Sequence, residues 1–336
     1  MTHAPTHPRN VTQEFQADRR HEMAEATIVN QKYHLQSFCD WAEEIELDDV
    51  SDLGGYTLNQ YKTWRRDTTG VNDMTLYNNL MTIKAFIKWC EKRDLVDDGL
   101  SGKLDIPQPD NPVRHATISP DRAQKILDYQ KKFQYAREKH VLFYLLYHTG
   151  IRIGTANALD IEDWDSSTST LRVKHRPDTG TPLKNQEDGE RVINIVHDEL
   201  AQLIDDYISN NHKGKEDKYG RMPLFPSRQG RASPQTLRHY IQHMTEPCII
   251  SNECPHDRNP SECEARLRQA KAFDCPSAIS PHPIRRSAIT DHLNKDVPKE
   301  VVEERMNVSQ KVIDRHYDER TESEKADVRK EHLDDI

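Results

Sequence analysis

The sequence has few glycines, few aromatic residues and no long apolar segment. Glycine accounts for 12 of the 336 residues, and aromatic residues make up 7% of the chain. The longest apolar run, Val141–Tyr147, is bounded by His140 and His148. An α-helix needs about 18–20 apolar residues to cross a bilayer, so this run is too short. The sequence therefore excludes a transmembrane protein, and no membrane partner is expected.

The beginning of the chain also lacks the features of a secretory signal. The opening stretch, MTHAPTHPRNVTQEF, contains no apolar core segment. We therefore expect a cytoplasmic protein in a reducing compartment, where disulfides are rare. The six cysteines are accordingly not predicted to form a disulfide framework.

Hydrophobic residues are scarce as well. They make up 35% of the chain, while charged residues make up 31% and the formal net charge is −9. Because the apolar residues still recur in periodic blocks, we expect a folded chain with a small core and a highly charged surface. An acidic surface combined with few glycines indicates adaptation to high salt.

Basic residues are concentrated in two segments despite the acidic total. Residues 62–93 and residues 114–140 each carry a net charge of +4, so the remaining residues carry −17. Affinity for DNA depends on clustered Lys and Arg side chains that neutralise phosphates, and these segments provide such clusters. The alternative is that they are solvated helix faces. The candidate DNA-binding residues are Lys62, Arg65, Arg66, Lys84, Lys88 and Arg114.

The chain is predicted to form two domains joined by a proline-rich linker. Apolar residues follow helical spacing from residue 12 to about residue 104, which indicates an all-helical domain of about four helices. Four prolines then fall within residues 106–120, where they disfavour helix. We place the first domain at residues 1–105, the linker at 106–119 and the second domain at 120–336.

The second domain is predicted to be mainly helical with a small sheet. Helices are expected from Pro120, around residues 140–148, at 198–209, at 234–244 and from His282 onward. Two strand-like runs, TLRVKHR at 170–176 and ERVINIV at 190–196, are separated by a polar arm rich in turn residues. The fold class is therefore mainly α with a β-hairpin.

Five residues form a set suited to phosphoryl transfer without a metal. Arg152 and Arg285 can bind the oxygens of a phosphodiester in bidentate fashion and stabilise the charge of the transition state. Tyr317 provides a phenol that needs this cationic environment and a nearby base, His282, to act as nucleophile. Lys184 can protonate the leaving 5′ oxygen as a general acid. Each residue taken singly also has an ordinary structural explanation.

The order of these motifs resembles the tyrosine recombinases of the phage integrase family. The matching segments are TGIR at Thr149–Arg152, HPIR at His282–Arg285, Tyr317, and the stretch Leu224–Ile241. The resemblance, whose overall character is similar to haloarchaeal integrases, implies an N-terminal SAM-like core-binding domain and a C-terminal catalytic domain. It also implies cleavage and rejoining of double-stranded DNA through a 3′-phosphotyrosyl intermediate, a tetramer on synapsed DNA, and no cofactor for catalysis.

The chain departs from the family pattern at two positions. The family usually has His or Trp nine residues before the tyrosine, where this chain has Val308, with Asn307 beside it as a candidate donor to the phosphate. Thr155 replaces an acidic residue that commonly follows the first arginine. In the hairpin arm, Lys174 remains an alternative to Lys184 as the general acid.

A cysteine-rich stretch precedes the HPIR motif, and we expect an insertion at about residues 246–277. Thiolate and imidazole side chains are suitable ligands for tetrahedral Zn²⁺, which predicts a structural zinc site there. The alternative is a loop whose cysteines are buried as small apolar residues, as we expect for Cys39 and Cys90. The candidate ligands are Cys254, His256, Cys263 and Cys275, with Cys248 as an alternate.

The sequence thus predicts a site-specific DNA recombinase, and two other functions remain open. The first is a DNA-binding protein of the same fold whose catalysis is weakened, because Val308 stands where the family has a donor. The second is a nicking and closing enzyme similar to type IB topoisomerases, which use the same chemistry.

Overall fold

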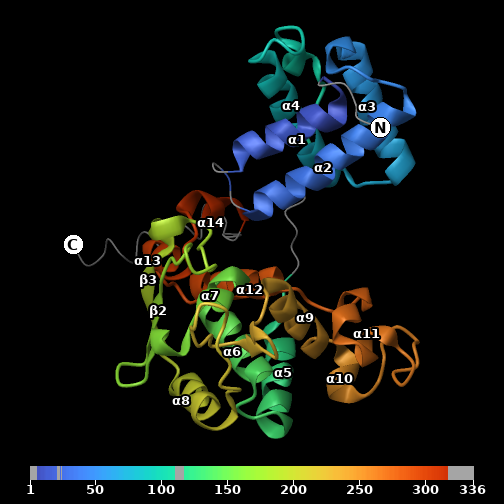
Figure 1. Ribbon diagram of the computed structural model, residues 1–336. Helices are drawn as coiled ribbons and strands as arrows, with labels where there is room; N and C mark the ends of the chain where they lie inside the picture. The colour runs from blue at the N-terminus through green and yellow to red at the C-terminus, as the bar shows by residue number, and fades with distance from the viewer. Residues whose placement is uncertain (1–5, 21–22, 24, 110–116, 317–336) are drawn as a thin grey trace, which may run out of the picture. The chain divides into compact units, whose positions relative to one another are not determined.

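A computed structural model of the chain describes residues 6–20, 23, 25–109 and 117–316 (Figure 1). The chain divides into two compact units, Met1–Val113 and Arg114–Ile336. Among the described residues, no helix combines the length and apolar character needed to span a membrane.

The described part of the first unit is entirely helical, as predicted. Its four α-helices are joined by short connections that include 3₁₀ turns at Val50–Asp52 and Leu100–Lys103 (Figure 1). Local sequence signals set the helix ends: the Asn72 side chain accepts from the amide of Thr75 at 2.9 Å, and Gly70 ends the preceding helix at φ 58°. The helices are α1 (Pro8–Arg19), α2 (Glu25–Glu44), α3 (Gly55–Thr69) and α4 (Asp73–Glu91).

Aromatic side chains dominate the core of the first unit. Phe38 lies 5.4 Å from Tyr61 and 5.8 Å from Phe86 between ring centroids, in edge-to-face arrangements. The Tyr61 hydroxyl donates to Oδ1 of Asn79 at 2.8 Å, so the buried phenol has a polar partner. Cys39 and Cys90, expected in the core, are both buried.

The second unit is mainly helical with small sheets, which confirms the predicted fold class. Helix α6 lies at its centre and packs against α5, α8, α9 and α12. Pro120 and Pro234 occupy first helical turns, after Ser119 and Ser233 at the N-caps. The helices are α5 (Pro120–Phe133), α6 (Glu138–Thr149), α7 (Ile153–Ala158), α8 (Asp198–Asp206), α9 (Pro234–Met244), α10 (Pro247–Ser251), α11 (Glu264–Leu267), α12 (Pro281–Asn294), α13 (Lys299–Met306) and α14 (Gln310–His316).

The predicted hairpin is present, with shorter paired strands than the sequence suggested. Strand β2 (Thr170–Val173) pairs antiparallel with β3 (Arg191–Asn194), with Leu171 opposite Ile193. A two-residue strand β1 (Trp164–Asp165) adds to the other side of β2 and was not predicted. Residues 174–190 form the hairpin arm between β2 and β3, and a second small pair joins β4 (Pro226–Ser227) to β5 (Gly230–Arg231).

A buried ionic network fixes the base of the hairpin arm. Asp160 and Asp163 are each 1% exposed. Arg221 donates from Nε to Asp160 at 2.8 Å, and Arg231 also donates to this carboxylate. Arg176 holds Asp163 with two hydrogen bonds of 2.6 and 2.9 Å. The network therefore ties the segment before β1 to the arm and to β5.

The last three helices share a small hydrophobic core of their own, which we call the C-terminal cluster. It joins the inner faces of α12, α13 and α14, so these helices hold one another in place. Its buried members are Ala288, Ile289, Leu293, Val302, Met306, Val308 and Ile313.

Candidate active site

Arg152 is placed by a tight turn at the end of α6. Gly150 ends this helix with φ 61°, a conformation that favours glycine, and Arg152 then caps α7. A Cβ atom at Gly150 would lie 2.7 Å from Sδ of Met306 and 3.3 Å from Cβ of Ala288. The glycine of the TGIR motif therefore allows α6 to approach α12 and α13 closely.

Arg285 connects this turn to the end of α13. It lies one helical turn after His282 on α12, so both residues project from the same side of that helix. The buried guanidinium of Arg285 donates from Nη1 to the carbonyl oxygen of Gly150 at 2.5 Å and from Nη2 to that of Asn307 at 3.4 Å. Three segments distant in sequence thus meet at one arginine.

The charges of basic side chains from three elements act on His282. Partial burial lowers the pKa of this imidazole, and the charges of Arg286, Arg285, Lys184 and Arg152 lower it further. The structure therefore brings together the four described residues of the predicted set. A neutral imidazole surrounded by cations can accept a proton, and the same cations favour an anion at this place.

The arm of the hairpin separates the two candidate lysines. Lys184 is exposed, and its charge acts on His282. Lys174 instead lies 3.6 Å from Oδ1 of the buried Asp163. This geometry favours Lys184 as the residue that can approach the cationic site.

The two positions that depart from the family pattern have different surroundings. Val308 is 6% exposed and belongs to the C-terminal cluster, so its side chain packs against apolar neighbours. Asn307 has φ 51° and its side-chain amide bonds to residues of the hairpin arm. Donation from Asn307 to a phosphate stays a prediction. Thr155 is buried in α7.

Arg191 is a further cation of the site that the sequence did not reveal. Burial lowers its pKa to about 10, and the charges of Arg152 and Arg305 contribute. Its Nε donates to the carbonyl oxygen of Arg305 at 2.8 Å, and Nη1 donates to that of Gly189 at 2.7 Å. An arginine at the start of a strand carries no signal by which sequence alone could place it beside Arg152.

Two predicted residues, Tyr317 and Arg114, lie outside the described part of the chain. Helix α14 ends at His316, so the position of Tyr317 in sequence directly follows a helix of the C-terminal cluster.

The family of this chain follows from a match that covers most of the second unit. The model of the phage integrase family matches residues 116–324. The chain belongs to the phage integrase family. The resemblance inferred from the TGIR and HPIR motifs is thereby confirmed.

Two known proteins similar to this integrase-family chain are a recombinase, matched by sequence, and a transposon integrase, matched by structure. Tyrosine recombinase XerC of Mycobacterium sp. (strain KMS) is 27% identical over 166 residues, which cover 47% of this chain and 53% of XerC. The chain thus spans about half the length of this curated relative. The Tn1549 transposon integrase in complex with transposon right end DNA superposes with a TM-score of 0.68 at 15% identity, covering 96% of this chain and 99% of that one.

A second solved structure shows the same fold. The lambda integrase (75–356) dimer bound to a COC′ core site has a TM-score of 0.61 at 12% identity, and the match covers 94% of this chain and 96% of that one. At these identities the likeness establishes the two-domain integrase architecture for the chain.

The five described candidate DNA-binding residues of this integrase-family chain lie on two helices of the first unit. Lys62, Arg65 and Arg66 belong to α3, and Lys84 and Lys88 lie one turn apart on α4. Lys62 pairs with Asp105 at 2.8 Å, and Arg66 lies 3.6 Å from Asp73. In each pair the carboxylate is well exposed, so the ion pair is weak and a DNA phosphate can replace the carboxylate.

The structure gives no support for the predicted zinc site. Among the described residues, no group of three or more His, Cys, Asp or Glu side chains is close enough to hold a metal ion. His256 instead interacts through Nε2 with the Ser277 hydroxyl at 2.9 Å, while Cys248 and Cys275 are buried as free thiols. The described residues therefore give no support to the zinc prediction from Cys254, His256, Cys263 and Cys275.

Hydrogen bonds to the backbone close the insertion where zinc was expected. Arg122 of α5 donates from Nη2 to the carbonyl oxygens of Thr245 and Ser277, both at 2.6 Å. The Thr245 hydroxyl also accepts from the amide of Ile279 at 2.9 Å. One arginine thus holds both ends of the segment that contains α10 and α11, which Figure 1 shows beside α9.

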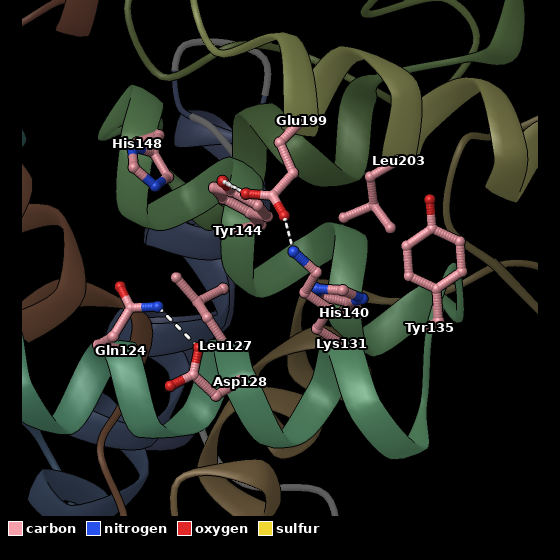
Figure 2. Close-up of a pocket in the computed structure, with 10 residues that line it drawn as sticks. All are labelled: Gln124, Leu127, Asp128, Lys131, Tyr135, His140, Tyr144, His148, Glu199 and Leu203. Carbon is pink, nitrogen blue, oxygen red and sulfur yellow. Dashed lines mark hydrogen bonds and ion pairs between the residues drawn. The ribbon is translucent and has the colours of Figure 1, made fainter.

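A cavity of about 160 Å³ lies between α5, α6 and α8, on other elements than those that carry the active-site cations. Figure 2 shows that Glu199 lies between Tyr144 and Lys131, both of which donate to its carboxylate. His140 is 3% exposed, and its Nδ1 has no hydrogen-bond partner in the described part of the chain. Burial lowers the pKa of His140 to about 4.

Acid is expected to destabilise the protein through His140. The folded pKa of about 4 lies below the ordinary unfolded value of about 6.5, so the unfolded state binds the proton more readily. The contribution of His140 to stability is then complete above pH 6.5 and falls as the pH drops to 4, by about 3 kcal/mol. His148 lines the same cavity and burial also lowers its pKa to about 4, so it adds a loss of its own. Urea unfolding across this range measures the loss. A His140→Phe variant should flatten the curve, and an unchanged pH dependence in that variant would contradict the assignment.

Proposed function

We propose that the chain is a tyrosine-type site-specific DNA recombinase that cuts and rejoins double-stranded DNA through a 3′-phosphotyrosyl link to Tyr317. The observation that carries this proposal is that Arg152, Lys184 and Arg285 lie near enough to His282 for their charges to act on its imidazole. Family membership supplies independent support.

The two arginines bind the scissile phosphate. Planar guanidinium groups match the geometry of phosphate oxygens and stay charged, so Arg152 and Arg285 stabilise the charge that develops as phosphorus becomes five-coordinate. Because Arg285 is already held by the carbonyl oxygens of Gly150 and Asn307, it requires little reorganisation when DNA binds.

Proton transfer is divided between His282 and Lys184. The Tyr317 oxygen attacks phosphorus and its proton passes to the neutral His282, while the bond from phosphorus to the 5′ oxygen breaks and Lys184 protonates the leaving oxygen. The freed 5′-hydroxyl of a partner strand then reverses the reaction. Because the bond energy is kept in the phosphotyrosyl link, the chemistry requires neither ATP nor a metal.

The two units have distinct tasks in this proposal. Residues 1–105 form the core-binding domain, residues 106–119 the linker and residues 120–336 the catalytic domain. Lys62, Arg65, Arg66, Lys84, Lys88 and Arg114 contact the DNA backbone, and four protomers assemble on two synapsed duplexes. Support comes from two structures of similar fold, the Tn1549 integrase in complex with transposon right end DNA and the lambda integrase dimer bound to a COC′ core site.

The acidic surface indicates the salt conditions in which the protein acts. We place the chain among haloarchaeal-type integrases that act in the cytoplasm at high salt, on the basis of its net charge of −9 and its few glycines. At molar salt counterion release contributes little to DNA affinity, so binding depends more on hydrogen bonds and shape.

A covalent trapping experiment tests the proposal. The substrates are duplexes of randomised sequence that carry a nick. Cleavage close to the nick releases the short fragment downstream of the cut, so the reaction cannot be reversed. Wild-type protein should form a denaturant-stable protein–DNA adduct both in dilute KCl and in about 2 M KCl. The Tyr317→Phe variant should form none. Absence of any Tyr317-dependent adduct at both salt concentrations would overturn the assignment. Sequencing the trapped DNA identifies the target.

The buried Val308 favours one alternative, a DNA-binding protein of this fold with weakened catalysis. Tight binding of the selected DNA without an adduct would support it. Relaxation of supercoiled plasmid without sequence preference and without recombinant products would instead indicate an enzyme that acts like a type IB topoisomerase.

A further inference from the structure

Asn307 connects the hairpin arm to the end of α13. Its Oδ1 accepts from Nδ2 of Asn185 at 2.5 Å, and its Nδ2 donates to the carbonyl oxygen of Asp188 at 3.4 Å. Both ends of the side-chain amide are therefore used by residues of the arm. Arg191 reinforces the contact, because it bonds the carbonyl oxygens of Gly189 and Arg305.

The backbone of Asn307 faces a different element. Its carbonyl oxygen accepts from Nη2 of Arg285 at 3.4 Å. The residue has φ 51° at the C-cap of α13, a left-handed conformation in which asparagine is tolerated and glycine is unstrained. One residue thus contacts the arm through its side chain and Arg285 through its backbone.

Lys184 lies next to this contact in the hairpin arm. It directly precedes Asn185, and residues 184–188 of the arm are all exposed, with buried residues only at Leu183 and Gly189 on either side. An exposed lysine loses considerable conformational entropy when it is held in one place. The hydrogen bond from Asn185 to Asn307 restricts the backbone next to Lys184 and leaves its ammonium group free to act.

We propose that Asn307 is a positioning residue that, through Asn185, fixes Lys184 relative to Arg285. This inference rests on the proposed recombinase function. It assigns Asn307 a role in protonation of the leaving group and gives it no direct contact with the reacting atoms.

The leaving group offers a direct test of this role. In a DNA substrate with sulfur in place of the 5′ bridging oxygen, the bond from phosphorus to sulfur breaks and a thiolate leaves. A thiolate needs no proton because the pKa of a thiol is far below that of an alcohol. Cleavage of this substrate no longer depends on Lys184, whereas it still depends on the fold, on DNA binding and on Tyr317.

The variants are Asn307→Gly, Asn185→Ala and the double variant, with Lys184→Ala as the reference for loss of the acid. Asn307→Gly suits the left-handed conformation, so it removes the amide without backbone strain. Gln186→Asn is the matched control, since residue 186 lies beside Asn185, has φ 51° and keeps an amide. Cleavage rates are measured on oxygen and sulfur substrates of the trapped target sequence.

On the oxygen substrate each single variant should lose about tenfold in rate, and the double variant should lose no more than either. On the sulfur substrate all three, like Lys184→Ala, should approach the wild-type rate. Equal losses on both substrates, or additive losses in the double variant, would overturn the inference. Failure of the wild-type protein to cleave either substrate would instead overturn the proposed function itself.

Discussion

Replacing Arg285 with lysine is expected to lower the rate of DNA cleavage by about 10²–10⁴-fold. The positive charge remains, but an ammonium group cannot reproduce the planar fork that now donates to the carbonyl oxygens of Gly150 and Asn307. Both the phosphate contact and the arrangement of the TGIR turn depend on that fork. Single-turnover cleavage of the trapped target measures the loss.

The same substitution at an exposed arginine provides the control. Arg268 lies on the insertion and pairs with Glu264 at the surface, so Arg268→Lys should keep the wild-type rate. Thermal unfolding of Arg285→Lys is measured in parallel, so that loss of the fold is distinguished from loss of transition-state stabilisation. An Arg285→Lys protein that is folded and cleaves within a few fold of wild type would contradict the assignment of Arg285.

Replacing Asp160 with alanine is expected to lower the free energy of unfolding by about 3–5 kcal/mol. The carboxylate is 1% exposed and accepts from Arg221 and Arg231. Its removal takes the carboxylate partner from the partly buried Arg221 and leaves Arg231 with Asp217 alone. Urea unfolding gives the loss directly. The site of the network, at the base of the hairpin arm, also predicts slower cleavage in the variant.

An exposed ion pair gives the comparison for Asp160. Lys295 and Asp291 lie 2.8 Å apart on the surface of α12, with side chains 69% and 44% exposed. Removing the lysine charge in Lys295→Gln should change the free energy of unfolding by less than about 0.5 kcal/mol. If Asp160→Ala lowered the free energy of unfolding by as little as Lys295→Gln, the buried ionic network would not stabilise the fold, and the prediction would be wrong.

Local signals made most of the fold predictable from sequence. Pro120 and Pro234 each follow a serine cap, and the structure begins helices at both. The alternating pattern around Leu171 and Ile193 likewise identified the hairpin. Strand β1 was missed because two residues are too few to show the alternating pattern of a strand. The split of the last helical region into α12, α13 and α14 depends on packing in the C-terminal cluster.

The site was predictable only where a motif fixes spacing. Arg152 and the pair His282 and Arg285 come from short motifs, and the structure brings them together with Lys184. Arg191 approaches Arg152 through tertiary structure alone, so no local pattern marks it. The zinc prediction found no support in the described residues, since a high density of cysteines in sequence does not determine the distances between their sulfur atoms.

The C-terminal cluster also limits how far the proposed nucleophile can travel. Ile313 is fully buried there, and Tyr317 follows it by only four residues. Even a fully extended chain of four residues spans no more than about 14 Å. While Ile313 stays packed, chain length alone therefore keeps the tyrosine hydroxyl within that span of Ile313, plus the length of its own side chain. The range of phosphates open to attack is thus set by an apolar side chain that has no part in the chemistry.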